Sequence, residues 1–158
     1  MSKESIIYMQ RAITLSRDKM HEGEGGPFGA VIVRGNEIIA EGWNRVTSTQ
    51  DPTAHAEVTA IRNACAKLGT YELVGCDIYT SCEPCPMCLG AIYWARIAHI
   101  YYANSREDAA SIGFDDQFIY EEMAKNIDCR SLPCLRIQMP EALLVFIDWK
   151  NKEDKMHY

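Results

Sequence analysis

Apolar residues recur at the spacing of one helical face near the start of the chain. A helix is therefore expected from Ser2 to about Glu22, with a buried side formed by Ile6, Met9, Ile13 and Met20. The glycine-rich stretch 23–27 cannot continue that helix, so the backbone turns there or approaches another part of the protein closely. The β-rich runs 28–33 and 37–42 flank a short Gly-Asn turn, which predicts a β-hairpin.

Helical and strand patterns alternate through the rest of the chain. Further strands are expected at 76–80, 98–103 and 135–139, and further helices at 54–68, 86–96, 105–112, 114–120 and 140–150. This alternation is typical of an α/β fold. We expect a three-layer α/β/α sandwich with a mixed five-stranded sheet, antiparallel at the first hairpin and parallel later, and with helices on both faces. The functional site is expected at the edge where strands end and helices begin.

Composition and charge narrow the class of protein. A chain of 158 residues is long enough for one domain with a proper core, and 47% hydrophobic residues is ordinary for a globular protein. The net charge of −6 and the lack of a Lys/Arg stripe argue against a nucleic-acid partner. The apolar runs are too short to span a bilayer. Seven cysteines, with no charged-then-apolar leader before them, predict a reducing cytoplasm and free or metal-bound thiols.

Two short motifs carry candidate metal ligands. Proteins hold Zn²⁺ tetrahedrally with Cys and His side chains, and hydrolytic sites leave one position open for water. Cys85 and Cys88 are three residues apart at the start of a helix for which Pro86 suits the first position, so their thiols lie on one face and can share a metal. His55 is the third candidate ligand.

Glu57 supplies a carboxylate two residues after the candidate histidine ligand. His-x-Glu followed by Pro-Cys-x-x-Cys is an established signature of zinc-dependent nucleobase deaminases. In that chemistry a zinc-bound hydroxide attacks the ring carbon that carries the amino group. We expect Glu57 to take the proton of the zinc-bound water and to deliver protons to the ring nitrogen and the leaving ammonia.

Two other interpretations of the cysteines stay open at this point. Cys82 lies three residues before Cys85, so three thiolates and His55 would form a closed structural zinc site without room for water. Pro84 argues against this, because it separates Cys82 from the helix that carries the other two cysteines. A redox-active Cys-x-x-Cys pair is the other possibility, but it would leave His55 and Glu57 unexplained.

The chain resembles the cytidine deaminase-like superfamily, and within it the small bacterial guanine deaminases. The resemblance covers nearly the whole chain, is weakest over 124–141, and rests on residues 25–33, 51–57, 79–96 and 113–120. It implies a hydrolase that converts guanine and water to xanthine and ammonia, with one Zn²⁺ per subunit. It also implies that residues 1–158 form a single deaminase domain. Two such chains would form a homodimer, in which the C-terminal segment from about residue 117 is exchanged between the subunits.

The resemblance assigns roles to individual residues. His55, Cys85 and Cys88 would hold the zinc, and Glu57 would shuttle the proton. Four further residues are implied in substrate recognition: Asn44 hydrogen-bonds the purine, Phe28 packs on its ring, Asp116 binds its amidine edge or assists proton transfer, and Tyr158 closes the neighbouring subunit's pocket. Position alone suggests instead that Asn44 caps its own backbone in a turn, and that one of Asp115 and Asp116 is a helix N-cap.

Three rival functions share parts of this pattern. A guanosine deaminase would use the same site with a looser lid. A tRNA adenosine deaminase would share the zinc motifs, but it would need a basic surface to bind an RNA loop. A zinc-stabilised binding module without activity is the rival from another class of protein, and the metal there would serve only folding.

Overall fold

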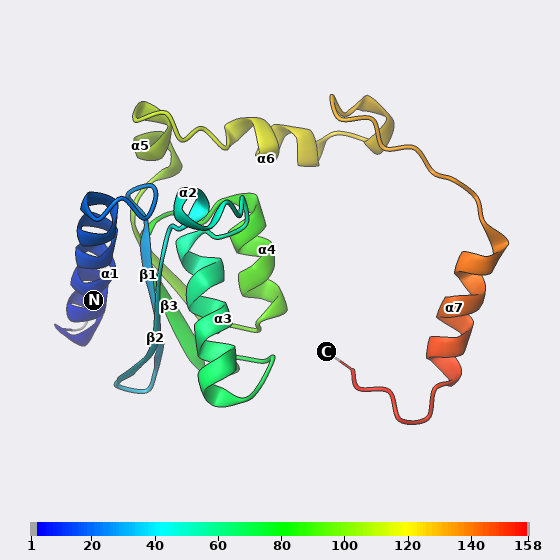
Figure 1. Cartoon of the computed structure of the whole chain (residues 1–158), viewed down its shortest axis with the longest axis horizontal. Coiled ribbons are helices and arrows are strands. Elements are labelled where there is room, and N and C mark those ends of the chain that lie inside the picture. Colours follow the sequence, from blue (N-terminus) through cyan, green and yellow to red (C-terminus); the bar gives the residue numbers. More distant parts are fainter. Residues whose placement is uncertain (1–2, 158) are drawn as a thin grey trace. The chain divides into compact units, whose positions relative to one another are not determined.

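A computed structural model describes residues 3–157, and the chain divides into two compact units, Met1–Ile119 and Tyr120–Tyr158. The first unit contains the sheet and most of the helices (Figure 1): α1 (Lys3–His21), β1 (Gly29–Arg34), β2 (Glu37–Trp43), α2 (Val46–Thr49), α3 (Ala56–Leu68), β3 (Cys76–Cys82), α4 (Pro86–Trp94), β4 (His99–Asn104) and α5 (Arg106–Ser111). Helix α6 (Gln117–Ala124) crosses the division. The second unit continues with the short 3-10 turn η1 (Ile127–Cys129) and α7 (Pro140–Asn151).

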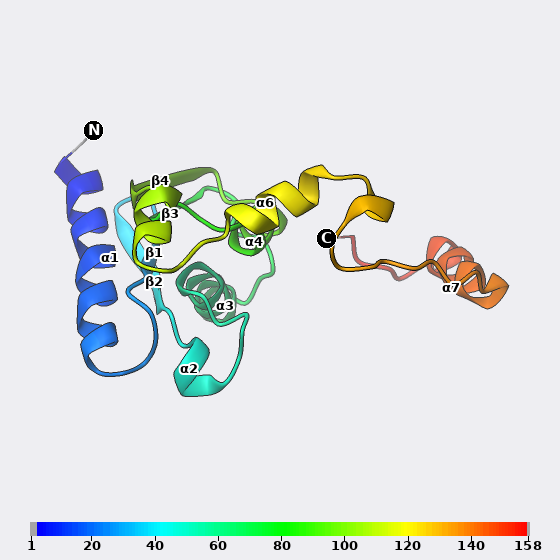
Figure 2. The same cartoon turned by 90° about the horizontal axis from the view of Figure 1, so that it is seen from above.

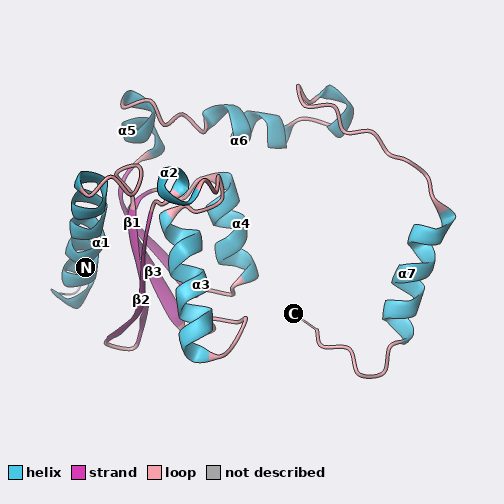
Figure 3. Cartoon of the chain, in the orientation of Figure 1, coloured by secondary structure: helices cyan, strands magenta, loops and turns pink. Residues whose placement is uncertain are grey.

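The first unit is built in three layers around a mixed sheet with strand order β2-β1-β3-β4. Strand β1 pairs antiparallel with β2 and with β3, and β3 pairs parallel with β4 (Figure 3). Helix α1 lies on one side of the sheet, and α3 and α4 lie on the other (Figure 2). The predicted α/β/α sandwich with a mixed sheet is therefore confirmed.

The predicted fifth strand at 135–139 is wrong. The sheet has four strands in the described part of the chain, and residues 135–139 form no ladder. Leu135 and Ile137 alternate with polar residues as they would in a strand, but their side chains are 86% and 82% exposed. Alternation reports only which side chains share a face, whereas a strand also needs a partner with free backbone groups.

Strand β1 is buried on both faces, which divides the core in two. Its Ala30 and Ile32 join the cluster under α3 and α4, together with Ile78 of β3. Val31 and Val33 point the other way and pack with residues of α1 such as Leu15. This two-sided burial explains why the run reads as continuously apolar in the sequence.

The sheet edge that carries the motifs is formed by strand ends. Strand β3 runs into the loop that begins α4, and β2 ends one residue before Asn44. The predicted helices at 54–68 and 86–96 correspond to α3 and α4, which begin directly after the candidate ligands His55 and Cys85. The short helix α2 was not predicted. Over residues 3–157, every helix is too short or too polar to span a bilayer.

Gly42 allows β2 to approach helix α3 closely. A Cβ atom built on Gly42 would lie 2.3 Å from the Ala56 carbonyl oxygen and 2.4 Å from the Ala60 amide nitrogen. Both of those atoms belong to the backbone of the helix that follows His55, so neither can move without displacing the helix. Gly42 therefore sets the distance between the sheet and the ligand-bearing helix.

We expect Gly42→Ala to lower the free energy of unfolding by about 1–3 kcal/mol or more, because overpacking against backbone cannot relax. Gly90→Ala is the matched control. Gly90 lies inside α4, and its added Cβ would meet no atom within 4 Å, so this change is expected to stabilise the protein by up to about 1 kcal/mol through helix propensity. Urea denaturation measures both. Equal stability of Gly42→Ala and the wild-type protein would contradict the close approach.

Candidate active site

Three candidate metal ligands meet where two helices begin. His55 is the N-cap residue of α3 and Cys85 is the N-cap residue of α4, while Cys88 lies in the first turn of α4. His55 Nδ1 lies 3.5 Å from the Sγ atoms of both Cys85 and Cys88. The three ligand atoms lie within 4.8 Å of one another, and this is the only such group of three or more ligating residues among residues 3–157.

These distances fit a tetrahedral zinc ion. With Zn–S and Zn–N bonds of about 2.3 and 2.1 Å, a tetrahedral Zn²⁺ holds a nitrogen and a sulfur ligand roughly 3.6 Å apart. The 3.5 Å separations from His55 Nδ1 match that value for both sulfurs. One imidazole and two thiolates leave the fourth position free of protein ligands, as in catalytic rather than structural zinc sites.

Without a bound cation, the protein favours Cys85 as a thiolate and Cys88 as a thiol. Hydrogen bonding by the Cys88 thiol, supported by the His55 ring, lowers the pKa of the Cys85 thiol to about 4. The adjacent Cys85 sulfur, together with burial, raises the pKa of Cys88 above its usual value. A divalent cation ionises the thiols that coordinate it, so it favours two thiolates over one thiolate and one thiol. The donor set is therefore suited to a metal such as Zn²⁺.

Glu57 lies beside the three ligands in the second position of α3. Its side chain is 6% exposed, and its two carboxylate oxygens lie 3.4 Å from Thr80 Oγ1 and 3.4 Å from Cys88 Sγ. Burial raises the pKa of the Glu57 carboxyl. A buried carboxyl with a raised pKa beside a metal site is suited to accept and return protons.

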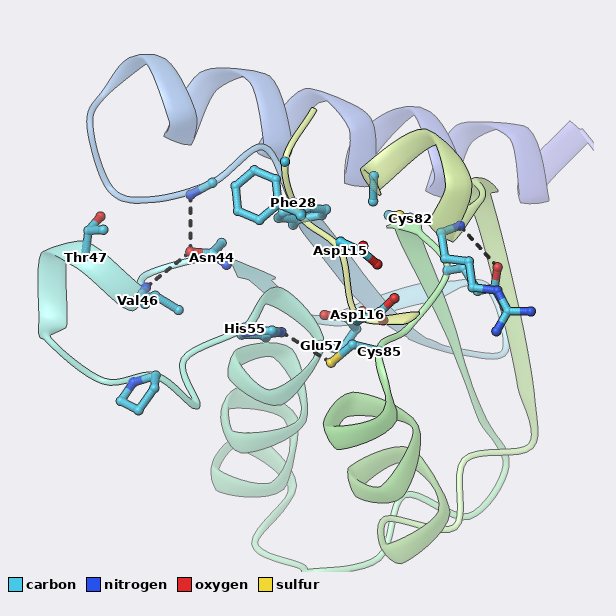
Figure 4. A pocket seen from close by; sticks show the side chains of 17 residues that line it. Phe28, Asn44, Val46, Thr47, His55, Glu57, Cys82, Cys85, Asp115 and Asp116 are labelled. Carbon is cyan, nitrogen blue, oxygen red and sulfur yellow. Dashed lines mark hydrogen bonds between the residues drawn. The ribbon is translucent and has the colours of Figure 1, made fainter. Parts of the chain in front are cut away.

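A cavity of about 460 Å³ opens onto Glu57 and two of the ligands, His55 and Cys85 (Figure 4). This volume lies in the range typical of small-molecule sites. Its wall includes Phe28, whose ring packs edge-on against Phe114 with the ring centres 4.9 Å apart. Asn44 and Asp116 also line it. The structure thus brings together, around one cavity, all the predicted site residues in its described part except the buried Cys88.

Asn44 both caps the backbone and faces the cavity. Its side-chain oxygen accepts hydrogen bonds from the backbone N–H groups of Gly26 and Val46, each at 3.2 Å. The bond to Val46, two residues on, is the turn contact that position alone predicts. Because backbone N–H groups can only donate, the atom they reach must be the amide oxygen, and the NH₂ group is left for a ligand.

The adjacent aspartates have different surroundings. Asp115 Oδ1 accepts a hydrogen bond from the Gln117 backbone N–H at 2.9 Å, which is a turn contact two residues on at the start of α6. Asp116 lines the cavity, and burial, with the nearby Cys85 sulfur, raises the pKa of its carboxyl. Both aspartates line the cavity, and the Asp115 carboxylate also holds the backbone at the start of α6.

Cys82 lies near the ligands but outside their cluster. Its side chain is buried, and its thiol donates to the Ser105 carbonyl oxygen at 3.5 Å. The group of ligating residues contains His55, Cys85 and Cys88 and not Cys82. This arrangement favours an open metal site over the closed one that a third cysteine would give.

Residues 2–104 match the family described as the cytidine and deoxycytidylate deaminase zinc-binding region. The chain belongs to this family. A guanine deaminase of Bacillus subtilis (strain 168) is 54% identical over 151 residues, which cover 96% of this chain and 97% of that protein. The crystal structure of a guanine deaminase from Bacillus subtilis superposes with a TM-score of 0.95 at 53% identity, covering 100% of this chain and 99% of the other.

Two further matches cover a smaller share of the chain. A tRNA-specific adenosine deaminase of Agrobacterium fabrum is 43% identical over 99 residues, which cover 63% of this chain and 64% of that protein. A solved structure in complex with 2,6-diaminopurine is 36% identical with a TM-score of 0.65, covering 69% of this chain and 61% of the other. Zn²⁺ is accordingly the cofactor of the His-Cys-Cys cluster.

Some features of the deaminase site lie beyond the sequence prediction or the described residues. Tyr158, predicted to close a pocket, lies outside the described residues. Phe114, Val46 and Thr47 also line the cavity, and no role was predicted for any of them from the sequence. A signal existed for Phe114, because it directly follows Gly113 and precedes the two aspartates, but its contact with Phe28 joins residues far apart in the chain.

We expect Cys85→Ala to lose bound zinc and Cys82→Ala to keep it, because only Cys85 lies within coordination distance of the other ligands. The measurement is the zinc-to-protein ratio of the purified variants by atomic absorption. Cys82 is the last residue of β3 and lies three residues before Cys85, so Cys82→Ala controls for general disturbance of this part of the chain. Loss of zinc from Cys82→Ala in a protein of unchanged stability would support the closed structural site.

Proposed function

We infer that this protein is a guanine deaminase, a zinc-dependent hydrolase that converts guanine and water to xanthine and ammonia. The observation that carries this conclusion is the placement of a three-ligand metal cluster and a buried carboxylate on one cavity. A relative that matches nearly the full length of this chain is a guanine deaminase. A binding module would need the metal cluster but not the buried Glu57.

The site residues divide the work of hydrolysis. The bound Zn²⁺ supplies a Lewis acid that makes water a nucleophile near neutral pH. Glu57 takes a proton from the attacking water and returns protons to the ring nitrogen and the departing ammonia. Thr80 and Cys88 flank its two oxygens, so the carboxylate is held in place for both transfers.

Four residues are proposed to select the purine. The NH₂ group of Asn44 donates to a lone pair of the ring system, and Phe28 packs on the ring. Asp116 accepts from the amidine edge of guanine, whose ring N–H and amino group are donors, or assists proton transfer there. Phe28, Asn44 and Asp116 line the cavity, which supports these roles. Tyr158 is the fourth residue, and it is proposed to act from a neighbouring subunit.

We expect Glu57→Ala to keep zinc but to lose activity by at least about 10²–10⁴-fold, the contribution typical of a general acid and base. Ammonia release from guanine measures the activity, and atomic absorption measures the metal. Glu37→Ala is the control, because the Glu37 side chain is 74% exposed and pairs only loosely with Lys67 at 3.8 Å. Full activity of a zinc-loaded Glu57→Ala protein would refute the assigned role.

A tRNA adenosine deaminase is the second candidate, since a relative of that activity is 43% identical over 99 residues. The net charge of −6 opposes it, because RNA binding calls for a basic surface. Ammonia release from a panel of guanine, guanosine, adenine, cytidine and a tRNA anticodon stem-loop decides between the candidates. Guanine as the best substrate supports the proposal. Preference for guanosine would assign a nucleoside deaminase, and preference for the RNA would assign the second candidate.

We also propose that the protein is a homodimer that exchanges its C-terminal segment, from about residue 117, between subunits. The support is apolar surface that the chain leaves uncovered. Helix α7 has no buried residue, and six of its apolar side chains are at least 43% exposed: Leu143, Leu144, Val145, Phe146, Ile147 and Trp149. Surface of this kind on a helix is typical of an interface. In the exchanged dimer, Tyr158 of each subunit would close the pocket of the other.

A mixing experiment tests the exchange. Chains with Glu57→Ala and chains that lack Tyr158 are each expected to be weakly active alone. Co-expressed in equal amounts, they should recover about a quarter of wild-type activity, because half the dimers are mixed and each mixed dimer has one complete site. Activity no higher than the mean of the parents would show that Tyr158 acts within its own subunit. A monomer in analytical ultracentrifugation would contradict the dimer itself.

We further infer that the protein works in a reducing compartment, the cytoplasm. All seven cysteines are free thiols. Cys85 and Cys88 both need their sulfurs as thiolates to hold the metal, and a disulfide between them would remove two of three ligands. Reducing conditions keep the site available.

A further inference from the structure

One wall of the cavity is an irregular segment between β2 and α3. Asn44, Val46, Thr47 and Pro52 line the cavity from this segment, which carries only the single-turn helix α2 as regular structure. The β1–β2 ladder ends at Trp43, and beyond it the backbone N–H groups of Asn44 and Arg45 donate to the carbonyl oxygens of Phe28 and Ala54. Thr47 and Ser48 are joined instead to the glycine-rich turn that follows α1.

The glycines of that turn are needed for its approach to Asn44. A Cβ atom on Gly25 would lie 2.4 Å from Asn44 Oδ1 and 2.5 Å from its carbonyl oxygen, so no larger residue fits there. Gly23 has a φ of +80°, which favours glycine. Such a run has little stiffness of its own. Glu24 is the only residue between Gly23 and Gly26 with a side chain that can hold the turn.

Glu24 contacts the cavity segment through both its backbone and its side chain. Its carbonyl oxygen accepts hydrogen bonds from Ser48 N and Thr47 Oγ1, each at 3.2 Å. Its carboxylate accepts from Ser48 Oγ at 2.8 Å and lies 3.5 Å from Arg45 Nε in an ion pair. The Ser48 hydroxyl lowers the pKa of this carboxyl, because its hydrogen bond favours the ionised form.

The same two segments hold the oxygen of Asn44. One of its donors is Gly26 N, two residues after Glu24, and the other is Val46 N, two residues before Ser48. If the segments separated, Asn44 Oδ1 would lose one of its two backbone donors, and the amide would be free to rotate. The contacts of Glu24 oppose that separation.

We propose that Glu24 is a positioning residue for substrate recognition, which holds the turn at 23–26 against the segment at 45–48 and thereby fixes the amide of Asn44. Glu24 does not line the cavity and touches no reacting atom. The proposal rests on the proposed function, in which Asn44 donates to the purine. It predicts that a carboxylate outside the cavity controls substrate affinity.

The test compares Glu24→Ala, Glu24→Gln and Glu22→Ala in steady-state deamination of guanine, or of whichever base the wild-type protein deaminates best. Glu24→Ala should raise KM about tenfold, the equivalent of one lost hydrogen bond, with a much smaller change in kcat. Glu24→Gln should restore most of the affinity, because its amide oxygen still accepts from Ser48. Glu22→Ala should match the wild-type protein, because the Glu22 carboxylate pairs with Lys19 on the exposed side of the turn.

A double-mutant cycle separates positioning from general stability. If Glu24 acts through Asn44, Glu24→Ala should add little to the loss already caused by Asn44→Ala. Ser48→Ala, at an exposed site, removes the same hydrogen bond from the other side and carries the test if Glu24→Ala fails to fold. Additive losses, or a KM of Glu24→Ala and Ser48→Ala equal to that of Glu22→Ala, would overturn the proposal. Absence of guanine deamination by the wild-type protein would contradict the proposed function alone. The role of Glu24 would still be tested, because KM is then measured with the base that the wild-type protein deaminates best.

Discussion

The metal site depends on two helices that begin close together, so that the imidazole at the start of one lies beside the two thiols at the start of the other. His55 occupies the N-cap position of α3 and Cys85 that of α4, and His55 Nδ1 lies 3.5 Å from both sulfurs. Exposed N–H groups at a helix start favour anions, so both the thiolates and Glu57 lie where the helix dipoles stabilise negative charge. A metal ion placed between these groups would find Cys85 already favoured as a thiolate by its low pKa, whereas it would have to ionise Cys88, whose pKa is raised.

The sheet determines where those helices begin. Parallel pairing of β3 and β4 requires a crossover, and α4 is that crossover, so its first turn follows directly from the end of β3. The close approach of Gly42 sets α3 at a fixed distance from the same sheet. Neither helix could shift by an ångström without changing the separation of the ligands, which links core packing to the geometry of the metal site.

Local patterns predicted the parts of this molecule that depend on nearby residues. The hairpin, the helices α1, α3 and α4 and the three-layer arrangement follow from periodicity and turn residues, and the Cys-x-x-Cys spacing placed two ligands on one helical turn. The prediction of a strand at 135–139 was wrong, because alternation of apolar and polar residues does not provide a neighbouring strand with which to pair. The choice between Asp115 and Asp116, and the contacts of Glu24 with Ser48, depend on where the backbone turns in three dimensions. The spacing of residues in the sequence does not predict this path of the backbone.

The orientation of the Asn44 amide has a chemical consequence. An asparagine that could rotate would offer a ligand either a donor or an acceptor, and it would tolerate edges of both kinds. Here two backbone N–H groups occupy the oxygen and lock the side chain in one orientation. The Asn44 NH₂ group can therefore donate a hydrogen bond to a carbonyl oxygen or to an unprotonated ring nitrogen. It repels an exocyclic amino group in the same place. One fixed amide therefore selects, among tautomers and among heterocycles of equal size, those that present a hydrogen-bond acceptor to it.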